Sequence, residues 1–395
     1  MTLLAPLAVH LKINWPEAHL FVANKFLPKY YKMYRQSSCG KLFKRIEEKI
    51  IACLEKYIAA EPNLDEIPDW LNANYNYGMI FFHRCDFAKY IHIFQNVEKF
   101  RQAMMKNHQL DKLDIEFIPL YFATGSVGIP ENLEAYIKAE MLGWRAHKKL
   151  ILLLDPKISV TNRCYLGYWS RYVTIISDLQ LIKLLSPLEK CLTAPIGWSM
   201  SFHEKILISH IAIGIIQGRW DQEQRPPLLT LSDEDYERGW KCLKSLGIPQ
   251  GAWFVCLHVR EAGWNDDVDS NASNCRNADI TTYVPAIKTI TARGGWVIRL
   301  GDPTMTPLPK MPQVIDYAHS DVKSDWMDVF LCAECRFCIA TSSGLFTLSS
   351  AFGVPIVATN FLPPYAMYCL SCRDLFLPRL CWFKGKNRFL NFKEL

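Results

Sequence analysis

The second half of the sequence alternates short apolar runs with longer amphipathic segments, and this alternation constrains the fold more than any other feature. Four apolar runs, WFVCLHV, GGWVIRLG, CRFCIAT and VPIVATN, are separated by segments that include helix-like patterns. Strands joined by helical crossovers pair in parallel. We therefore predict that residues near 253–259, 295–300, 336–340 and 355–358 are neighbouring parallel strands of one doubly wound sheet.

Two predicted helices in this half have clear boundary signals. Ser232 is a good N-cap before three acidic residues, which favour the positive end of the helix dipole, and Gly247 can end the helix. Pro285 is tolerated only in a first turn, so the next helix should begin near Thr282. Ser324 followed by Asp325 predicts a third helix start.

The middle of the chain shows the same alternation. DIEFIPLYFA is a strand candidate, and the glycine-containing turn 124–128 follows it. ENLEAYIKAEMLGWR then has helical spacing, and KLILLLD is a second strand candidate. A strand, turn, helix and strand in this order form a βαβ unit, which predicts a second parallel sheet.

The chain of 395 residues exceeds the usual size of a single hydrophobic core, so we expect several domains. Residues 1–110 show helical periodicity and predict a helical region that packs on the body or on a protein partner. We expect an acceptor-binding α/β domain at 111–230, a nucleotide-sugar-binding α/β domain at 231–362, and a tail at 363–395 that packs back. Two doubly wound, Rossmann-like domains facing a cleft constitute a GT-B-like fold.

The charge and hydropathy of the sequence argue against a nucleic-acid binder and against a membrane-spanning protein. The net charge of +6 is modest and scattered, whereas a nucleic-acid binder would concentrate it in a stripe. Apolar runs fall short of the roughly 20 residues that span a bilayer. The N-terminus carries no basic segment of the kind that begins a secretory signal. We therefore predict no nucleic-acid partner, no transmembrane segment and a cytoplasmic location.

Fourteen cysteines are many for such a protein. Cys332, Cys335 and Cys338 have a spacing that could bind a metal, as could the CxxC pair Cys369 and Cys372. The first of these segments reads as helix and the third as strand, which would separate the thiols. We predict reduced, buried thiols without a metal.

Polar residues follow the predicted strands, where doubly wound domains gather their ligands. Any one of them could be an ordinary surface charge or helix cap, but together they predict a site. The candidate donor-binding residues are His258, Arg260, Arg299, Gly301, Asp302, Tyr317, Ser342, Ser343 and Gly344.

The types of these residues suit a diphosphate. TSSG precedes the short helix LFTLSSAF, whose N-terminus can hold a phosphate. Arg260 and Arg299 can make bidentate, permanently charged contacts to a pyrophosphate. Such contacts would neutralise a departing nucleoside diphosphate without a metal or other cofactor.

The segments HVREAGWNDD, RNADITTY, KSDWMDVFL and CRFCIATSSGL resemble a family of bacterial glycosyltransferases defined mainly by genome comparison. The resemblance covers most of residues 115–362 and implies a GT-B-like fold. A more distant similarity is to fucosyltransferases that use GDP-fucose, whose His-x-Arg and Ser-Ser features lie near the diphosphate. His258-Val259-Arg260 and Ser342-Ser343 match them, which implies a hexosyl- or fucosyltransferase using a GDP- or UDP-linked sugar.

An inverting transferase also needs a carboxylate that removes the proton of the acceptor hydroxyl. Glu261, Glu131 and Asp266 are the candidates, although each could equally be a helix cap or salt-bridge partner. The acceptor would be a saccharide, a peptide or another small hydroxyl compound. A sugar-nucleotide epimerase or hydrolase, and a binding protein without catalysis, are the alternatives to a transferase.

Overall fold

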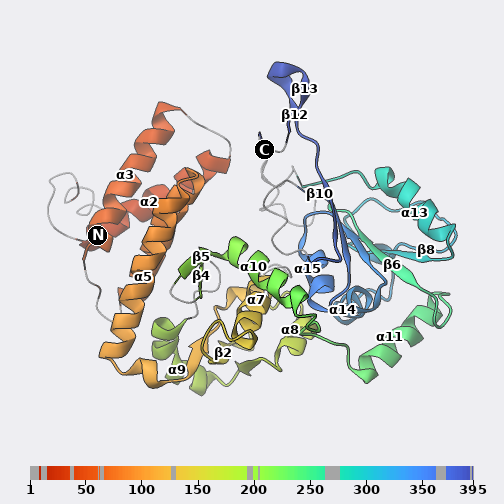
Figure 1. The fold of residues 1–395 in the computed structure, drawn as a ribbon, viewed down its shortest axis with the longest axis horizontal. Helices are drawn as coiled ribbons and strands as arrows, with labels where there is room; N and C mark the ends of the chain where they lie inside the picture. The colour runs from red at the N-terminus through yellow and green to blue at the C-terminus, as the bar shows by residue number, and fades with distance from the viewer. Residues whose placement is uncertain are drawn as a thin grey trace. The chain divides into compact units, whose positions relative to one another are not determined.

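The computed structural model describes residues 9, 16–35, 40–60, 62, 66–125, 130–193, 199–202, 205–262, 276–361, 371–391 and 394. The chain divides into two compact units (Figure 1). The first comprises residues 1–117, 179–194 and 204–207, and the second comprises 118–178, 195–203 and 208–395. The candidate site lies entirely in the second unit.

The first unit is mainly helical, as its apolar periodicity predicts. Its helix α3 buries Ile46, Ile50, Cys53, Leu54 and Tyr57, which recur at three- and four-residue spacing and so share one face. Sequential helices α2, α3, α4 and α5 pack against one another. The elements of this unit are α2 (Pro16–Arg35), α3 (Lys41–Ile58), α4 (Ile67–His83), α5 (Phe87–Asn107), η2 (Leu110–Lys112), β1 (Ile115–Phe117) and α9 (Leu179–Leu192).

A small sheet has the strand order β1-β2-β3. Strand β2 (Lys149–Leu153) is the predicted KLILLLD strand, and it pairs in parallel with β3 (Val173–Ile176). The predicted strand DIEFIPLYFA is shorter than expected, because a helical turn, α6 (Tyr121–Thr124), replaces its second half. Pro119, which lacks a backbone N–H, separates the two parts. The rest of this region comprises α7 (Pro130–Met141), α8 (Arg163–Trp169), β4 (Ser199–Phe202), β5 (Lys205–Ile208) and α10 (Ser209–Gln222).

The large sheet of the second unit has the order β11-β10-β9-β6-β7-β8, with parallel pairing throughout. Four of its strands are the four predicted from the apolar runs, so that prediction is confirmed. Counted from β6, the order is 3-2-1-4-5-6, the arrangement of the doubly wound Rossmann sheet. The strands are β6 (Phe254–His258), β7 (Trp296–Arg299), β8 (Val314–Ile315), β9 (Cys338–Ala340), β10 (Ile356–Phe361) and β11 (Leu375–Pro378).

The helices between these strands begin where their sequences indicate. Ser232 accepts a 3.1 Å hydrogen bond from the Asp235 N–H at the start of α11 (Asp233–Ser245). The Ser324 hydroxyl accepts a 3.3 Å bond from the Met327 N–H at the start of α14 (Asp325–Glu334). Pro285 lies in the first turn of α13 (Val284–Thr291), which the 3₁₀ turn η3 (Ile280–Tyr283) precedes. The remaining helix, α15 (Gly344–Ala351), follows β9.

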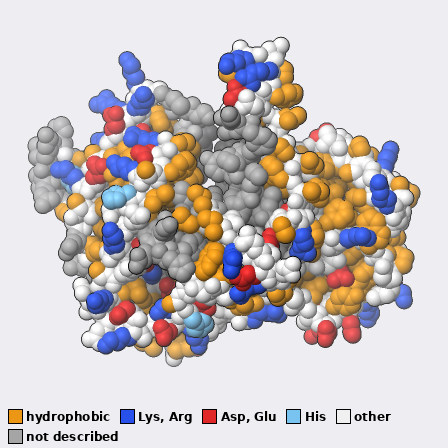
Figure 2. All heavy atoms as spheres, in the orientation of Figure 1, with side chains coloured by type: hydrophobic (Ala, Val, Ile, Leu, Met, Phe, Trp, Pro, Cys, Tyr) orange, Lys and Arg blue, Asp and Glu red, His pale blue; other side chains and the backbone are white. Residues whose placement is uncertain are grey.

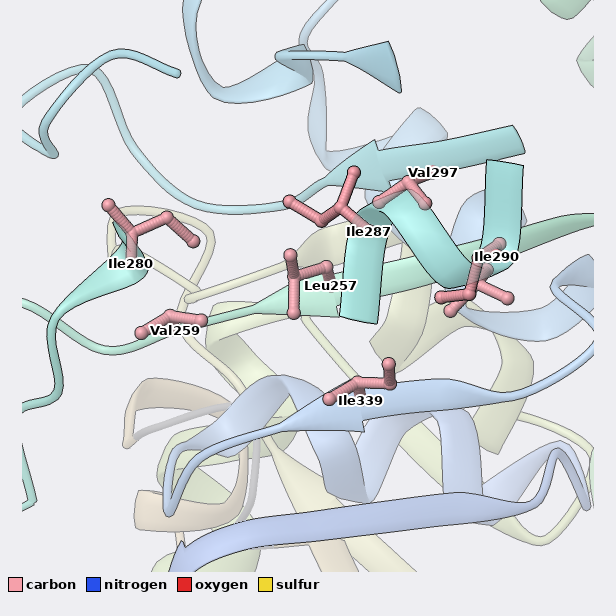
Figure 3. Close-up of a cluster of buried hydrophobic side chains, with 8 residues drawn as sticks. Leu257, Val259, Ile280, Ile287, Ile290, Val297 and Ile339 are labelled. Atoms are coloured by element: carbon pink, nitrogen blue, oxygen red, sulfur yellow. The ribbon is translucent and has the colours of Figure 1, made fainter. Parts of the chain in front are cut away.

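Both faces of β6 are covered, which explains why its sequence is a continuous apolar run. Val255, Leu257 and Val259 pack with Ile287 and Ile290 of α13 in the cluster of Figure 3. Residues of the opposite face alternate with these. The Cys256 thiol, for example, lies 3.3 Å from the carbonyl oxygen of Leu331 on α14. The end of β6 is therefore fixed from two sides.

The expected boundary between residues 230 and 231 lies inside the second unit. Helix α8 packs on α14, and the Asn162 side chain donates a 2.9 Å bond to the backbone carbonyl of Asp325. Asp235 accepts hydrogen bonds from both the Tyr168 hydroxyl and the Trp326 indole. A division into two α/β domains at residue 230 stays a prediction.

The three central cysteines lie on different elements, as expected. Cys332 is on α14, Cys335 follows that helix and Cys338 is on β9; all three are buried and free of disulfides. Burial raises the pKa of the Cys332 and Cys338 thiols, which disfavours the thiolate that binds metals. Within the described ranges, no three His, Cys, Asp or Glu side chains are grouped to hold a metal ion. Cys369 lies outside these ranges.

In the described part of the chain, no helix combines the length and the apolar character that crossing a bilayer requires.

Candidate functional site

The candidate site lies where the chain reverses direction across the large sheet. From β6 the chain proceeds to β7 and β8 on one side, and it then returns to β9 on the other. Adjacent loops that leave in opposite directions open a crevice at the carboxyl ends of the two strands. The loop after β6 carries Arg260, and the loop after β9 carries Ser342 and Ser343.

Hydrogen bonds join these two loops directly. The Arg260 backbone N–H donates to the Thr341 hydroxyl at 2.8 Å, and the Thr341 N–H donates to the His258 carbonyl at 3.0 Å. The Ser343 hydroxyl and His258 Nδ1 share a bond of 2.9 Å. The structure therefore brings the HVR and TSSG motifs together, as predicted from the carboxyl ends of the strands.

Arg260 is half-buried in the loop that follows β6. Its guanidinium donates to the Asn277 side-chain oxygen, and its carbonyl accepts a 3.0 Å bond from the Ala278 N–H. The loop thus places a permanent positive charge at the end of β6.

The pKa of His258 depends on its burial and on the charges around it. Burial lowers its pKa to about 4, with the Arg299 charge as the second cause and those of Arg260 and Lys323 as smaller ones, while Asp302 opposes the shift. The imidazole is therefore neutral near pH 7 and supplies no charge to a ligand. Of the cations that act on it, Arg299 and Lys323 are themselves paired with carboxylates.

The N-terminus of α15 lies beside the loop that follows β6. Ser342, Ser343 and Gly344 are half-buried at the start of this eight-residue helix. The Ser343 side chain bonds to His258 and, among the residues described, makes no cap bond to its own helix. Backbone N–H groups of a first helical turn have no partners within the helix and attract anions.

Arg299 differs from the prediction. It lies at the end of β7 with no exposed surface, whereas a diphosphate ligand must be reached from solvent. Its guanidinium is 3.1 Å from an Asp316 oxygen and 3.3 Å from a Glu261 oxygen. Arg299 therefore belongs to an internal ion-pair network, and its direct contact with a ligand stays a prediction.

Glu261 belongs to the same network. One carboxylate oxygen faces Arg299 and the other accepts a 2.8 Å bond from the Thr306 N–H. A general base needs a free oxygen directed at the substrate proton. The geometry instead gives Glu261 the role of fixing the loop 301–313, so it does not favour the predicted catalytic role.

Gly301 and Asp302 form the turn that follows β7. Gly301 has a φ of +150°, which favours glycine, and a Cβ there would lie 2.3 Å from the sulfur of Met305, whose side chain would have to move. The Asp302 carboxylate accepts a 2.9 Å bond from the Thr304 N–H. Both residues therefore shape this turn, and their contact with a donor stays a prediction.

Tyr317 is also internal. Its side chain is fully buried, and its hydroxyl accepts a 3.0 Å bond from the Ser324 N–H and donates to the Ser324 carbonyl at 3.2 Å. Burial raises its pKa, so the phenol stays protonated. Tyr317 thus fixes the start of α14, in contrast to the donor contact predicted for it.

The other two candidate bases cannot be located. The Glu131 side chain and the whole of Asp266 lie outside the described residues, so both assignments stay predictions.

Sequence reasoning missed two residues that the structure brings to this region. Asn277 holds the Arg260 guanidinium, and it could have been found within RNADITTY, a polar segment just before a predicted helix. Lys323 lies close enough to His258 to influence its pKa and forms a 3.2 Å ion pair with Asp328. Its position before Ser324, a predicted helix cap, was the only available signal.

Comparisons with known proteins add limited information. No protein-family model and no curated sequence matches the chain. Solved structures with similar outlines include E. coli ADP-heptose heptosyltransferase II, with 13% identity, a TM-score of 0.38, and coverage of 69% of this chain and 92% of the other. The iron-containing dodecameric glycosyltransferase TibC from E. coli H10407 has 13% identity, a TM-score of 0.39, and coverages of 70% and 66%.

The E. coli heptosyltransferase WaaC, solved with ADP-2-deoxy-2-fluoro heptose, has 13% identity, a TM-score of 0.33, and coverages of 69% and 94%.

Proposed function

We propose that the chain is a glycosyltransferase that moves a sugar from a nucleotide-sugar donor to a hydroxyl-bearing acceptor. The observation that supports this most is the convergence of Arg260 and the α15 N-terminus at the switch point of a 3-2-1-4-5-6 sheet. That crevice is where doubly wound domains bind nucleotides. The permanent charge of Arg260 at this strand end suits the diphosphate of a GDP- or UDP-linked sugar.

The proposed chemistry follows from the charges. As the glycosidic bond breaks, negative charge develops on the leaving diphosphate. The Arg260 guanidinium and the first N–H groups of α15 would neutralise it, and such groups act most strongly when fixed in advance. Asn277 would orient the guanidinium, while Arg299 would hold the loop after β7 from inside.

A saccharide, a peptide or another small hydroxyl compound would be the acceptor, and Glu131 or Asp266 would remove its proton in an inverting reaction. The resemblance of the motifs to bacterial glycosyltransferases agrees with this assignment. A GT-B-like, two-domain body acting in the cytoplasm is part of the same proposal.

Nucleotide binding tests the proposal. A thermal-shift panel of ADP, GDP, UDP, dTDP and CMP should show one nucleotide that stabilises the protein by about 2.7 kcal/mol at 100 times its dissociation constant. Arg260→Ala should weaken that binding about 30-fold, equivalent to about 2 kcal/mol. Arg293→Ala is the matched control, because Arg293 is exposed at the opposite edge of the sheet.

Product analysis separates the possible reactions. A transferase consumes the nucleotide sugar only when an acceptor is present, whereas an epimerase or hydrolase converts it alone. Nucleotide binding that Arg260→Ala leaves unchanged would remove Arg260 from the site. Binding without turnover under any of these conditions would indicate a binding protein.

A further inference from the structure

The C-terminal arm, residues 375–391, extends the second unit beyond its sheet. It begins as the edge strand β11 and continues into a small antiparallel hairpin of β12 (Trp382–Phe383) and β13 (Arg388–Phe389), joined by the turn η5 (Lys384–Lys386) (Figure 1). The rings of Trp382 and Phe389 meet edge to face with centroids 4.9 Å apart. The Leu390 N–H donates a 2.8 Å bond to the Cys381 carbonyl, so the hairpin has its own internal contacts.

Large apolar side chains on this arm face solvent. Leu375 is 64% exposed and Leu377 is 57% exposed, and their spacing of two places them on one face of β11. Leu380, which follows the strand, is 70% exposed. Trp382, Phe383 and Phe389 add exposed aromatic surface on the hairpin. Single exposed apolar side chains are ordinary, but a contiguous group marks an interaction surface.

The charge of the arm is of one sign. Residues 375–391 contain Arg379, Lys384, Lys386 and Arg388 and no Asp or Glu, although the whole chain has 39 acidic residues against 45 basic ones. Arg388 pairs with Glu394 at 2.5 Å, whereas Lys384 and Lys386 are exposed at the hairpin turn. Figure 2 shows blue and orange side chains together on this hairpin, at the top of the view.

Aromatic and leucine side chains beside lysines are the combination that binds a membrane interface. Trp and Phe rings settle at the level of the lipid headgroups, and lysines are attracted by anionic lipids. The Lys386 ammonium lies 5.6 Å from the centre of the Phe383 ring, so charge and apolar surface meet at the hairpin turn. We infer that the C-terminal arm docks the protein on an anionic membrane surface.

The strand directions determine which edge of the sheet the C-terminal arm extends from. Strand β11 runs parallel to β10, and β10 runs parallel to β9, so the arm leaves the sheet at the carboxyl edge. The Arg379 N–H fixes its root with a 2.7 Å bond to the Phe361 carbonyl at the end of β10. The crevice between β6 and β9 opens at that same edge, so the membrane-bound protein would hold its candidate site toward the lipid.

Co-sedimentation with lipid vesicles tests the inference in the full chain without any nucleotide, so its outcome does not depend on the proposed function. The protein should bind vesicles that contain phosphatidylglycerol, less so at high salt, and only weakly bind pure phosphatidylcholine. Lys384→Ala with Lys386→Ala should weaken binding about 30-fold, since each surface lysine contributes about fivefold. Lys241→Ala with Lys244→Ala, two exposed lysines of α11, is the matched control.

A second pair of variants tests the apolar contribution. Leu377→Thr with Leu380→Ser changes exposed side chains only, so an unchanged circular dichroism spectrum is expected together with weaker vesicle binding. Failure of the parent protein to bind anionic vesicles, or equal loss of binding in the α11 control, would overturn the inference. A dimer in gel filtration that the arm variants dissociate would assign the surface to a second copy of the chain instead.

Discussion

The Ser343 hydroxyl lies 2.9 Å from Nδ1 of His258, and this bond joins two strand ends that are distant in the sequence. His258 is buried, so removal of its partner leaves a polar nitrogen unpaired inside the protein, which costs about 1–3 kcal/mol. We expect Ser343→Ala to lower the free energy of unfolding by this amount in urea titrations. Ser342→Ala should change it much less, and equal effects of the two variants would contradict the assigned role of the bond.

Replacement of Arg299 should lower the free energy of unfolding much more than replacement of Arg260. Arg299→Met leaves Glu261 and Asp316 together without their buried cation, so we expect a loss of about 3–5 kcal/mol in the free energy of unfolding. Arg260→Ala should change it by less than about 1 kcal/mol, because the Arg260 side chain is only half-buried. A stable Arg299→Met protein with weakened nucleotide binding would restore Arg299 as a ligand contact.

His258 should make stability depend on pH. Its folded pKa of about 4 is below the ordinary value of 6.5, so as the pH falls the unfolded state takes up a proton first. This group should therefore lower the free energy of unfolding by about 2 kcal/mol between pH 7 and pH 5. His258→Gln lacks this titration, and subtracting its urea-unfolding curve from that of the parent isolates the effect. A difference that stays constant with pH would show that the histidine is not buried in its neutral form.

Thiol labelling should separate two groups of cysteines. Cys85 and Cys372 are exposed and should react with iodoacetamide in the native protein. Cys256, Cys332, Cys335 and Cys338 are buried and should react only after unfolding. Peptide mass spectrometry locates the labelled sites. Rapid labelling of Cys332 in the native state, or zinc or iron bound in stoichiometric amount, would contradict our account of this region.

Metal removal tests the proposed chemistry. If Arg260 and the α15 N-terminus neutralise the leaving group, turnover should be unchanged in the presence of EDTA. The control is addition of Mg²⁺ or Mn²⁺ to the treated enzyme. Loss of activity in EDTA that either ion restores would mean that a metal, rather than these groups, balances the diphosphate charge.

The large sheet was largely predictable because its strands are short, buried apolar runs that can be recognised one at a time. WFVCLHV and CRFCIAT are examples. The order of the strands is not predictable in this way, because the pairing of β6 with β9 depends on contacts between distant segments. The small sheet was harder to predict, because Pro119 interrupts an apolar run that otherwise resembles one long strand.

Part of the candidate site was also predictable from the sequence. Position at a strand end identified Arg260, Ser342 and Ser343, since the end of a parallel strand is a property of the local sequence. Position could not distinguish Arg299 from Arg260, because burial of Arg299 depends on Asp316 and Glu261, which come from two other loops. Position could not reveal the burial of Tyr317 for the same reason, since its partner Ser324 begins the next helix.

The central place of β6 has a consequence for synthesis on the ribosome. During synthesis, β7 can pair early with one edge of β6. The neighbour on the other edge, β9, is made only after β8 and α14. Until then the backbone of this mainly apolar strand presents an open edge, which is a template for pairing with other chains. We therefore expect chains truncated between residues 315 and 337 to aggregate or to be held by chaperones. Completion of β9 would be the step that commits this half of the protein to its native state.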